Sequence, residues 1–133
     1  MRRFMVMAVL AIGLGGPLAA QGQDIEATIG AQIDAFKSDD FAQAFTFASP
    51  GIQGMFQTPE NFGMMVRQGY PMVWRPADVR FLELREIAGA WWQKVMITDA
   101  QGTAYILDYQ MIQTENGWKI NGVQVLDSAA ANV

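Results

Sequence analysis

The sequence predicts an α+β fold, in which helices come first and a curved, four-stranded antiparallel meander follows. Two observations carry this prediction. As far as about residue 69, apolar residues recur every three or four positions, the spacing of a helix that buries one side. From residue 79 onward, apolar and polar residues alternate in four runs that short turns separate, which is the spacing of strands.

The first twenty residues have the pattern of a secretory signal peptide. Two arginines follow the initial methionine, an apolar run extends from Phe4 to Leu14, and small residues lead up to Ala20. The apolar run is too short to cross a bilayer, which takes about twenty residues. We therefore expect residues 1–20 to be cleaved during export, leaving a periplasmic or secreted protein with no membrane association.

The remaining chain is expected to form one domain over residues 21–126, with a frayed tail at 127–133. Seven basic and thirteen acidic residues follow position 20, so the mature net charge is −6. A small acidic domain repels phosphate backbones, and we expect no nucleic acid partner. The chain has neither cysteine nor histidine, which excludes thiol nucleophiles, Ser-His pairs and the usual zinc, copper and haem ligands. No cofactor is expected.

The first two helices are predicted from their apolar stripes and end signals. An apolar stripe extends from Ile25 to Phe36, and a second extends from Phe41 to Ala48. The acidic run Ser38–Asp40 supplies an N-cap and an acidic first turn for the second helix, and it does not resemble a calcium loop. Ser49-Pro50-Gly51 is expected to stop this helix, and an apolar connection is expected over Ile52–Gln57.

The third helix has the clearest start signal in the chain. Thr58 is placed as the N-cap, Pro59 as the first helical residue, and Glu60 lies in the first turn. Gly69 is expected to end the helix in a left-handed conformation.

Four strands are predicted after this helix, over Val79–Ile87, Trp91–Asp99, Thr103–Gln113 and Gly117–Val125. Asn116-Gly117 is the signal of a type I′ hairpin, and the other breaks, at Gly89 and at Asp99–Gly102, are also short. Connections of this length join antiparallel neighbours, so the strands should form a meander.

Both faces of the predicted sheet carry large apolar side chains. On the third strand, Tyr105 and Tyr109 share one face, and Ile106 and Ile112 share the other. Helices should cover one face. The other face is either covered by a partner, or the sheet curls around a cavity.

The order of elements resembles that of the NTF2-like superfamily of cone-shaped α+β domains, and residues 33–45 are similar to its opening. More narrowly, the segments 45–50, 65–71 and 117–123 are similar to a family of small exported bacterial proteins classed as a domain of unknown function. The resemblance covers residues 24–126. It implies three N-terminal helices packed on a curved sheet, but it supplies no catalytic residues. NTF2-like cones host isomerases, dehydratases, binding proteins and assembly domains.

The candidate ligand-binding residues are Arg67, Tyr70, Trp74 and Arg75, in the connection between helices and sheet, together with Tyr109. Tyrosine and tryptophan offer apolar faces with one polar atom, and arginine can bind a carboxylate through two hydrogen bonds. Such a set could hold a small organic acid or an aromatic ligand. Alternatively, Tyr70 and Trp74 plug the end of the core while the arginines pair with surface acids.

The leading hypothesis is a non-enzymatic domain that binds a small amphipathic ligand or a protein partner. One alternative is an isomerase or dehydratase that uses an Asp or Glu with a Tyr, but Asp108 points away from Tyr105 and Tyr109 on the same strand. No catalytic or metal-binding residue is therefore assigned. Another alternative is a homodimeric assembly domain that pairs through an uncovered sheet face carrying Trp91 or Trp92.

Overall fold

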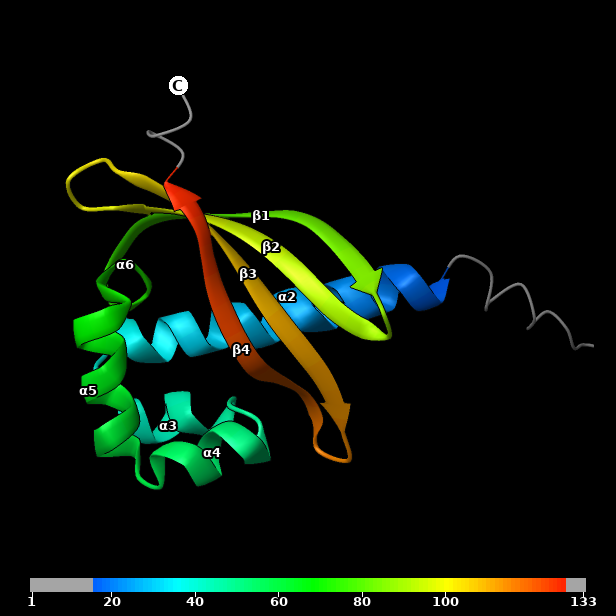
Figure 1. Cartoon of the computed structure of the whole chain (residues 1–133), viewed down its shortest axis with the longest axis horizontal. Coiled ribbons are helices and arrows are strands. Elements are labelled where there is room, and N and C mark those ends of the chain that lie inside the picture. Colours follow the sequence, from blue (N-terminus) through cyan, green and yellow to red (C-terminus); the bar gives the residue numbers. More distant parts are fainter. Residues whose placement is uncertain (1–15, 129–133) are drawn as a thin grey trace, which may run out of the picture.

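The structure is a computed structural model that describes residues 16–128. These residues form five helices followed by one four-stranded antiparallel sheet, which confirms the α+β prediction (Figure 1). Most of the predicted signal peptide and residues 129–133 of the predicted tail lie outside the described residues. Within them, none of the helices is both long enough and apolar enough to cross a membrane.

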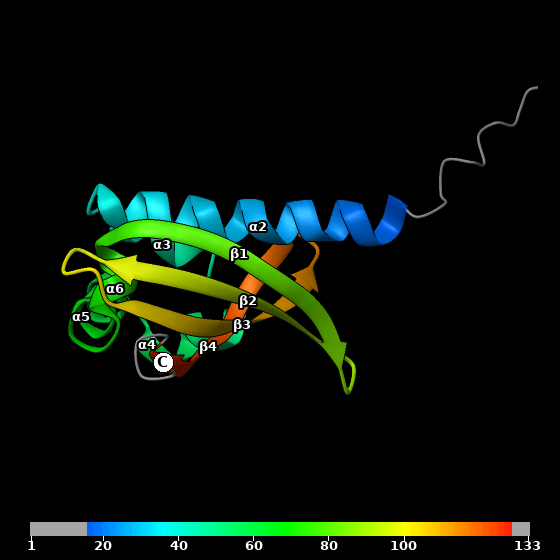
Figure 2. The ribbon, with the colours of Figure 1, turned by 90° about the horizontal axis from the view of Figure 1, so that it is seen from above.

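The longest helix is α2 (Gly16–Lys37), which runs along the sheet in both views (Figures 1 and 2). Its apolar stripe of Ile25, Ile29, Ile33 and Phe36 is almost completely buried, as the spacing predicts. The predicted border between the signal peptide and the domain, after residue 20, falls inside this helix.

The next two helices are α3 (Phe41–Thr46) and α4 (Pro50–Phe56). The first of these ends before Ser49-Pro50-Gly51, but the prediction of an apolar connection over Ile52–Gln57 was wrong. Ser49 is the N-cap of α4, because its hydroxyl accepts a hydrogen bond from the backbone N–H of Ile52 at 3.2 Å. Pro50 then begins the helix, where its missing N–H costs nothing. With α4 and the short α6, the described chain has five helices rather than three.

Helix α5 (Pro59–Gly69) begins as predicted, with the Thr58 hydroxyl accepting from the backbone N–H of Asn61 at 3.1 Å. The prediction of a left-handed Gly69 was wrong, since this residue does not have a positive φ. Tyr70 leaves the helix instead, with φ of −135°. The following residue, Pro71, disfavours the helical conformation in the residue before it. Pro71 also starts the short helix α6 (Pro71–Trp74).

The strands are β1 (Pro76–Ile87), β2 (Ala90–Asp99), β3 (Ala104–Thr114) and β4 (Gly117–Ser128). They pair antiparallel in the order β1-β2-β3-β4, so the meander is confirmed. The first strand starts three residues before the predicted Val79, and the last continues two residues past the predicted end of the domain at 126.

The hairpin turns differ from the prediction in type. Among the described residues of the β3–β4 turn, only Gly117 has a positive φ, of 102°, whereas a type I′ turn needs positive φ at both central residues. The type I′ prediction for Asn116-Gly117 was therefore wrong. Two adjacent positive φ values occur instead in the β1–β2 turn, at Ala88 (52°) and Gly89 (82°).

Irregular pairing bends the two edge strands, whose curvature is plain in Figures 1 and 2. In β4, Asn121 is an extra residue between the pairs Met111–Ile120 and Gln110–Gly122. The inner face of the sheet and the helices enclose a single core, to which the two central strands contribute Val95, Ile97, Leu107, Tyr109 and Met111.

Candidate functional site

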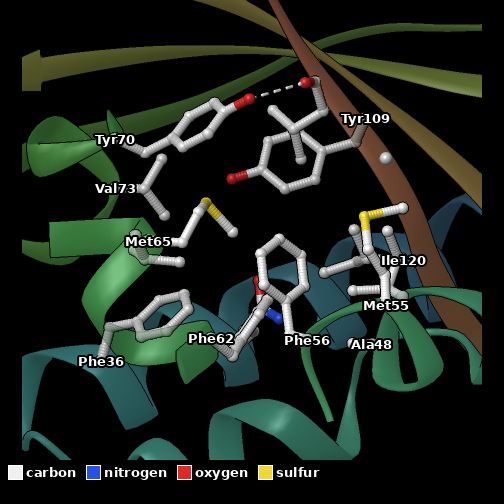
Figure 3. Close-up of a pocket in the computed structure, with 15 residues that line it drawn as sticks. Phe36, Ala48, Met55, Phe56, Phe62, Met65, Tyr70, Val73, Tyr109 and Ile120 are labelled. Carbon is white, nitrogen blue, oxygen red and sulfur yellow. Dashed lines mark hydrogen bonds between the residues drawn. The ribbon is translucent and has the colours of Figure 1, made fainter. Parts of the chain in front are cut away.

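A cavity of about 400 Å³ lies where helices α2, α4, α5 and α6 face strands β3 and β4 (Figure 3). Its lining is almost entirely aliphatic, aromatic or thioether. The polar side chains among the described lining residues are Gln32, Tyr70 and Tyr109. The cavity is of a size that takes small organic ligands, and its composition suits apolar ones.

Three phenylalanines form the helical side of the cavity (Figure 3). The ring centroids of Phe36 and Phe56 lie 5.9 and 5.8 Å from that of Phe62, within the usual range for packed aromatic pairs. Two methionines complete this side, Met65 on α5 and Met55 on α4, and Met55 is 68 % exposed. Because methionine side chains are flexible, this wall can adjust to differently shaped occupants.

The position of α4 over the sheet is set by contacts between the residues just before it and β4. The backbone N–H of Ser49 donates to the carbonyl of Ile120 at 2.8 Å, and the N–H of Ile120 donates to the carbonyl of Phe47 at 2.9 Å. Ser49 is fully buried, and its hydroxyl donates to Oδ1 of Asn121 at 2.7 Å. Asn121 in turn donates to Gln110 at 3.0 Å. The bulged residue of β4 therefore anchors the helix that carries Met55.

The three segments that resemble the exported family meet around this cavity. The segment 45–50 pairs with 117–123 through the bridge between Ala48 and Ile120. The segment 65–71 joins them through Tyr70, whose hydroxyl donates to the backbone carbonyl of Val123 at 3.2 Å (Figure 3).

Tyr109, on β3, lies at the floor of the cavity and has no exposed surface. Its ring places the hydroxyl among the lining side chains, on the side where Met65 and Val73 lie (Figure 3). This hydroxyl is buried and has no hydrogen-bond partner among the described residues. Burial raises the pKa of Tyr109, so the phenol stays protonated and can donate a hydrogen bond. The other such buried donor, Nε1 of Trp118, belongs to a residue that does not line the cavity.

The remaining predicted site residues, Arg67, Trp74 and Arg75, do not line the cavity. They form a separate group with Asp39, which we call the Asp39 cluster. Arg75 makes two hydrogen bonds to the Asp39 carboxylate, at 2.9 and 3.0 Å, and Nε1 of Trp74 donates to the same carboxylate at 2.9 Å. The guanidinium carbons of Arg75 and Arg67 lie 4.1 and 5.4 Å from the Trp74 ring centroid.

The structure thus divides the five predicted residues, bringing Tyr70 and Tyr109 together at the cavity and placing the two arginines and Trp74 outside it. Tyr70 lines the cavity, and its role in ligand binding stays a prediction. Arg75 pairs with a surface acid, as the alternative reading expected. The hydrogen bonds from Trp74 and Arg75 lower the pKa of Asp39.

The described residues that line the cavity include no carboxylate, which the isomerase or dehydratase alternative requires. Asp108 lies on the opposite face of the sheet, where Arg85 binds it through two hydrogen bonds of 2.9 and 2.8 Å. Asp99 accepts from the hydroxyl of Tyr105 at 3.4 Å, but it also holds the β2–β3 turn by accepting from backbone N–H groups. None of these residues lines the cavity.

The sequence interpretation missed the residues of α4 that line the cavity, Ile52, Met55 and Phe56. They had been placed in a connection because Ser49-Pro50-Gly51 was taken as a stop. The signal that would have found them is the similarity of Ser49-Pro50 to Thr58-Pro59, since both pairs are an N-cap followed by a proline at the first helical position.

Helices and one face of a four-stranded antiparallel meander, with an apolar cavity between them, define a small α+β domain. The chain matches the family model described as Domain of unknown function (DUF4864) over residues 18–133, and it belongs to that family. No curated protein and no solved structure matches the chain. The resemblance to the NTF2-like superfamily therefore stays a prediction.

Proposed function

We propose that this protein is a binding protein, not an enzyme, and that it holds a small, largely apolar ligand in the cavity. The observation that carries the proposal is the cavity of about 400 Å³, with its aromatic and methionine walls. An apolar occupant of a space of this size gains dispersion contacts with the aromatic and methionine side chains and covers them from water. The exposed Met55 at its edge offers a flexible way in.

We further propose that the ligand is bound outside the cytoplasm, in the periplasm or in the medium. The support is the sequence pattern of residues 1–20. Cleavage after Ala20 would shorten α2 and leave its apolar stripe in place, because Ala19 and Ala20 are exposed and Ile25 is the first buried residue in the part of the helix from residue 19 onward.

Titration with the fluorescent apolar probe phenyl-naphthylamine tests the binding proposal. The wild type should bind the probe with saturation at one site and a strong rise in fluorescence. Val123→Trp puts a large side chain where Val123 lines the cavity, and it should weaken probe binding at least tenfold, or about 1.4 kcal/mol. Val125→Trp is the matched control, since Val125 lies on the same strand but is exposed and does not line the cavity.

Saturable binding that survives Val123→Trp and is lost in Val125→Trp would place the probe elsewhere and contradict the proposal. A wild type that shows no saturable binding would contradict it as well. Thermal unfolding of all three proteins shows whether each variant is folded.

A second candidate function is assembly into a homodimer through the outer face of the sheet. Trp92, Met96, Ile106 and Ile112 alternate with the core residues of β2 and β3, are half-buried, and are not part of the core. Trp92 therefore marks the uncovered face, whereas Trp91 packs against the core. Sedimentation at tens of micromolar decides this question, and a monomer that Trp92→Lys leaves unchanged would count against the dimer.

A further inference from the structure

We propose that the ligand carries an uncharged hydrogen-bond acceptor, such as a ketone, ester or ether oxygen, which the hydroxyl of Tyr109 binds at the floor of the cavity. This inference rests on the proposed function, and it narrows the ligand to a chemical class.

The first support is the hydroxyl itself. It belongs to Tyr109, a fully buried residue that lines the cavity, and it has no hydrogen-bond partner among the described residues. Leaving a buried donor unpaired is unfavourable. A ligand whose acceptor pairs with this hydroxyl therefore gains more binding free energy than a ligand whose acceptor meets a donor that already has a partner. The neighbouring Tyr70 shows the difference, because its hydroxyl already donates to the carbonyl of Val123 at 3.2 Å.

The second support is the charge of the walls. None of the described residues that line the cavity has an ionised side chain. Gln32 is uncharged, and its amide nitrogen is already bound to the carbonyl of Ala44 at 3.1 Å. A carboxylate or ammonium ion in this space would lose its hydration and find no opposite charge, which is far more costly than burying a neutral carbonyl.

The arginines that an acidic ligand would need as counter-ions lie in the Asp39 cluster. Arg75 is engaged with Asp39 and with the carbonyl of Phe36 at 2.9 Å, and Arg67 lies against Trp74. Neither arginine lines the cavity. A small organic acid, which the sequence suggested for these arginines, is therefore not the class of ligand that the cavity selects.

The ligand's hydrogen-bond acceptor must also suit the Tyr109 phenol, which stays uncharged. The Tyr109 phenol keeps its proton at neutral pH, as tyrosine ordinarily does, and burial raises its pKa further, so it cannot serve as a counter-ion for a cationic ligand. The phenol therefore favours an acceptor, and the apolar walls favour a hydrocarbon attached to it.

Three eight-carbon compounds test the inference: methyl hexyl ketone, octane and octanoate, each below its aqueous solubility at pH 8, competing with bound phenyl-naphthylamine. We expect the ketone to bind the wild type about tenfold more tightly than it binds Tyr109→Phe, the factor that one hydrogen bond of ordinary strength gives, and more tightly than the wild type binds octanoate. Tyr109→Phe should leave octane affinity unchanged, because octane has no acceptor. Tyr105→Phe is the matched control, because Tyr105 does not line the cavity, and it should behave as the wild type.

Three outcomes would overturn the inference. Equal ketone affinity in the wild type and in Tyr109→Phe would mean that the hydroxyl selects nothing. An equal loss of ketone and octane affinity in Tyr109→Phe would assign the effect to the shape of the cavity, and a preference for octanoate would contradict the uncharged class. If the probe binds but the head groups are not distinguished, this inference alone fails; if neither the probe nor any compound binds, the proposed function fails too. Tyr109→Phe removes only an unpaired hydroxyl, so it should melt no lower than the wild type.

Discussion

Asp39 has a left-handed backbone, with φ of 57°, where a glycine is the usual residue. It follows the end of α2, and the N–H groups of Asp39 and Asp40 donate to the carbonyls of Phe36 and Ala35 at 2.9 and 2.8 Å, the pattern of a Schellman helix end. Glycine would fit this backbone with less strain but has no carboxylate. The bonds from Trp74 and Arg75 to that carboxylate offset the strain and join the end of α2 to α6.

Low pH should weaken this connection between α2 and α6. The bonds from Trp74 and Arg75 lower the pKa of Asp39 in the folded protein, so its contribution to stability is present above the pKa of the unfolded chain, near 4. That contribution is lost as the pH falls through the lower, folded pKa. Asp39→Asn keeps a residue that tolerates the left-handed conformation but removes the charge.

Urea unfolding at several pH values between 7 and 2.5 measures the effect. Asp39→Asn should be less stable than the wild type at pH 7, and the difference should shrink once the pH drops below about 4. Arg75→Gln should show the same convergence, since it removes the partner of the ion pair. A difference that stays constant over the whole range would contradict the role of the Asp39 charge.

Asp39 also shows that the role of a charged residue cannot always be predicted from its neighbours in the sequence. Ser38–Asp40 was interpreted as the start of the second helix, which is correct for Asp40, whose carboxylate accepts from the N–H of Gln43 at 3.1 Å. The role of Asp39 depends on side chains at positions 74 and 75. No local pattern could reveal a contact between residues that far apart in the chain.

At the scale of helices and strands, two N-caps with the same local chemistry have different surroundings. Thr58 caps α5 at an exposed position, and its hydroxyl bonds only within its own helix start. Ser49 caps α4, is fully buried, and also donates to Asn121 on β4.

Ser49→Ala should therefore cost more stability than Thr58→Ala. Loss of a cap alone costs about 1 kcal/mol, which is the expected result for Thr58→Ala. Ser49→Ala also leaves Asn121 without its partner, so we expect a total loss of roughly 2–3 kcal/mol. Chemical denaturation of both variants gives the comparison. Equal losses would mean that the bond to Asn121 adds nothing to stability.

Local patterns predicted the strands within three residues at every boundary, because alternation and short turns are properties of neighbouring residues. They did not predict the bulge at Asn121, which exists because Ser49 and Gln110 both bond to its side chain. Nor did they predict α4, since Ser-Pro-Gly is equally a stop and a start signal. The cavity depends on both features, so its helical wall could not be derived from the sequence.

At the scale of the whole molecule, the sequence identified two of the cavity residues, Tyr70 and Tyr109, by residue type and not by position in space. Tyr70 and Tyr109 are far apart in the chain and come together only when β4 lies beside β3. Tyr70 bonds to the carbonyl of Val123, and Val123 pairs with Tyr109. Which groups would remain unpaired could not be predicted, since that depends on every neighbour of the Tyr109 hydroxyl.

Export should be visible in the mass of the mature protein. When the full chain is expressed in a bacterium with a secretory pathway, we expect the soluble periplasmic fraction to contain a protein lacking residues 1–20, as measured by intact-mass spectrometry. A variant in which Leu10 is replaced by Arg interrupts the apolar run and should keep the full mass and stay in the cytoplasm. Full-length protein in the cytoplasm for both forms would contradict the export proposal.

The anchoring of α4 and Tyr70 on β4 has a consequence for timing. A chain that leaves the ribosome or a translocation channel with its N-terminus first presents α2 to β3 before β4 is free to pair. Until β4 docks, Ser49 lacks Asn121, Tyr70 lacks Val123, and the cavity has no wall on that side. The proposed ligand can therefore be held only after β4 has docked, in the compartment where folding ends.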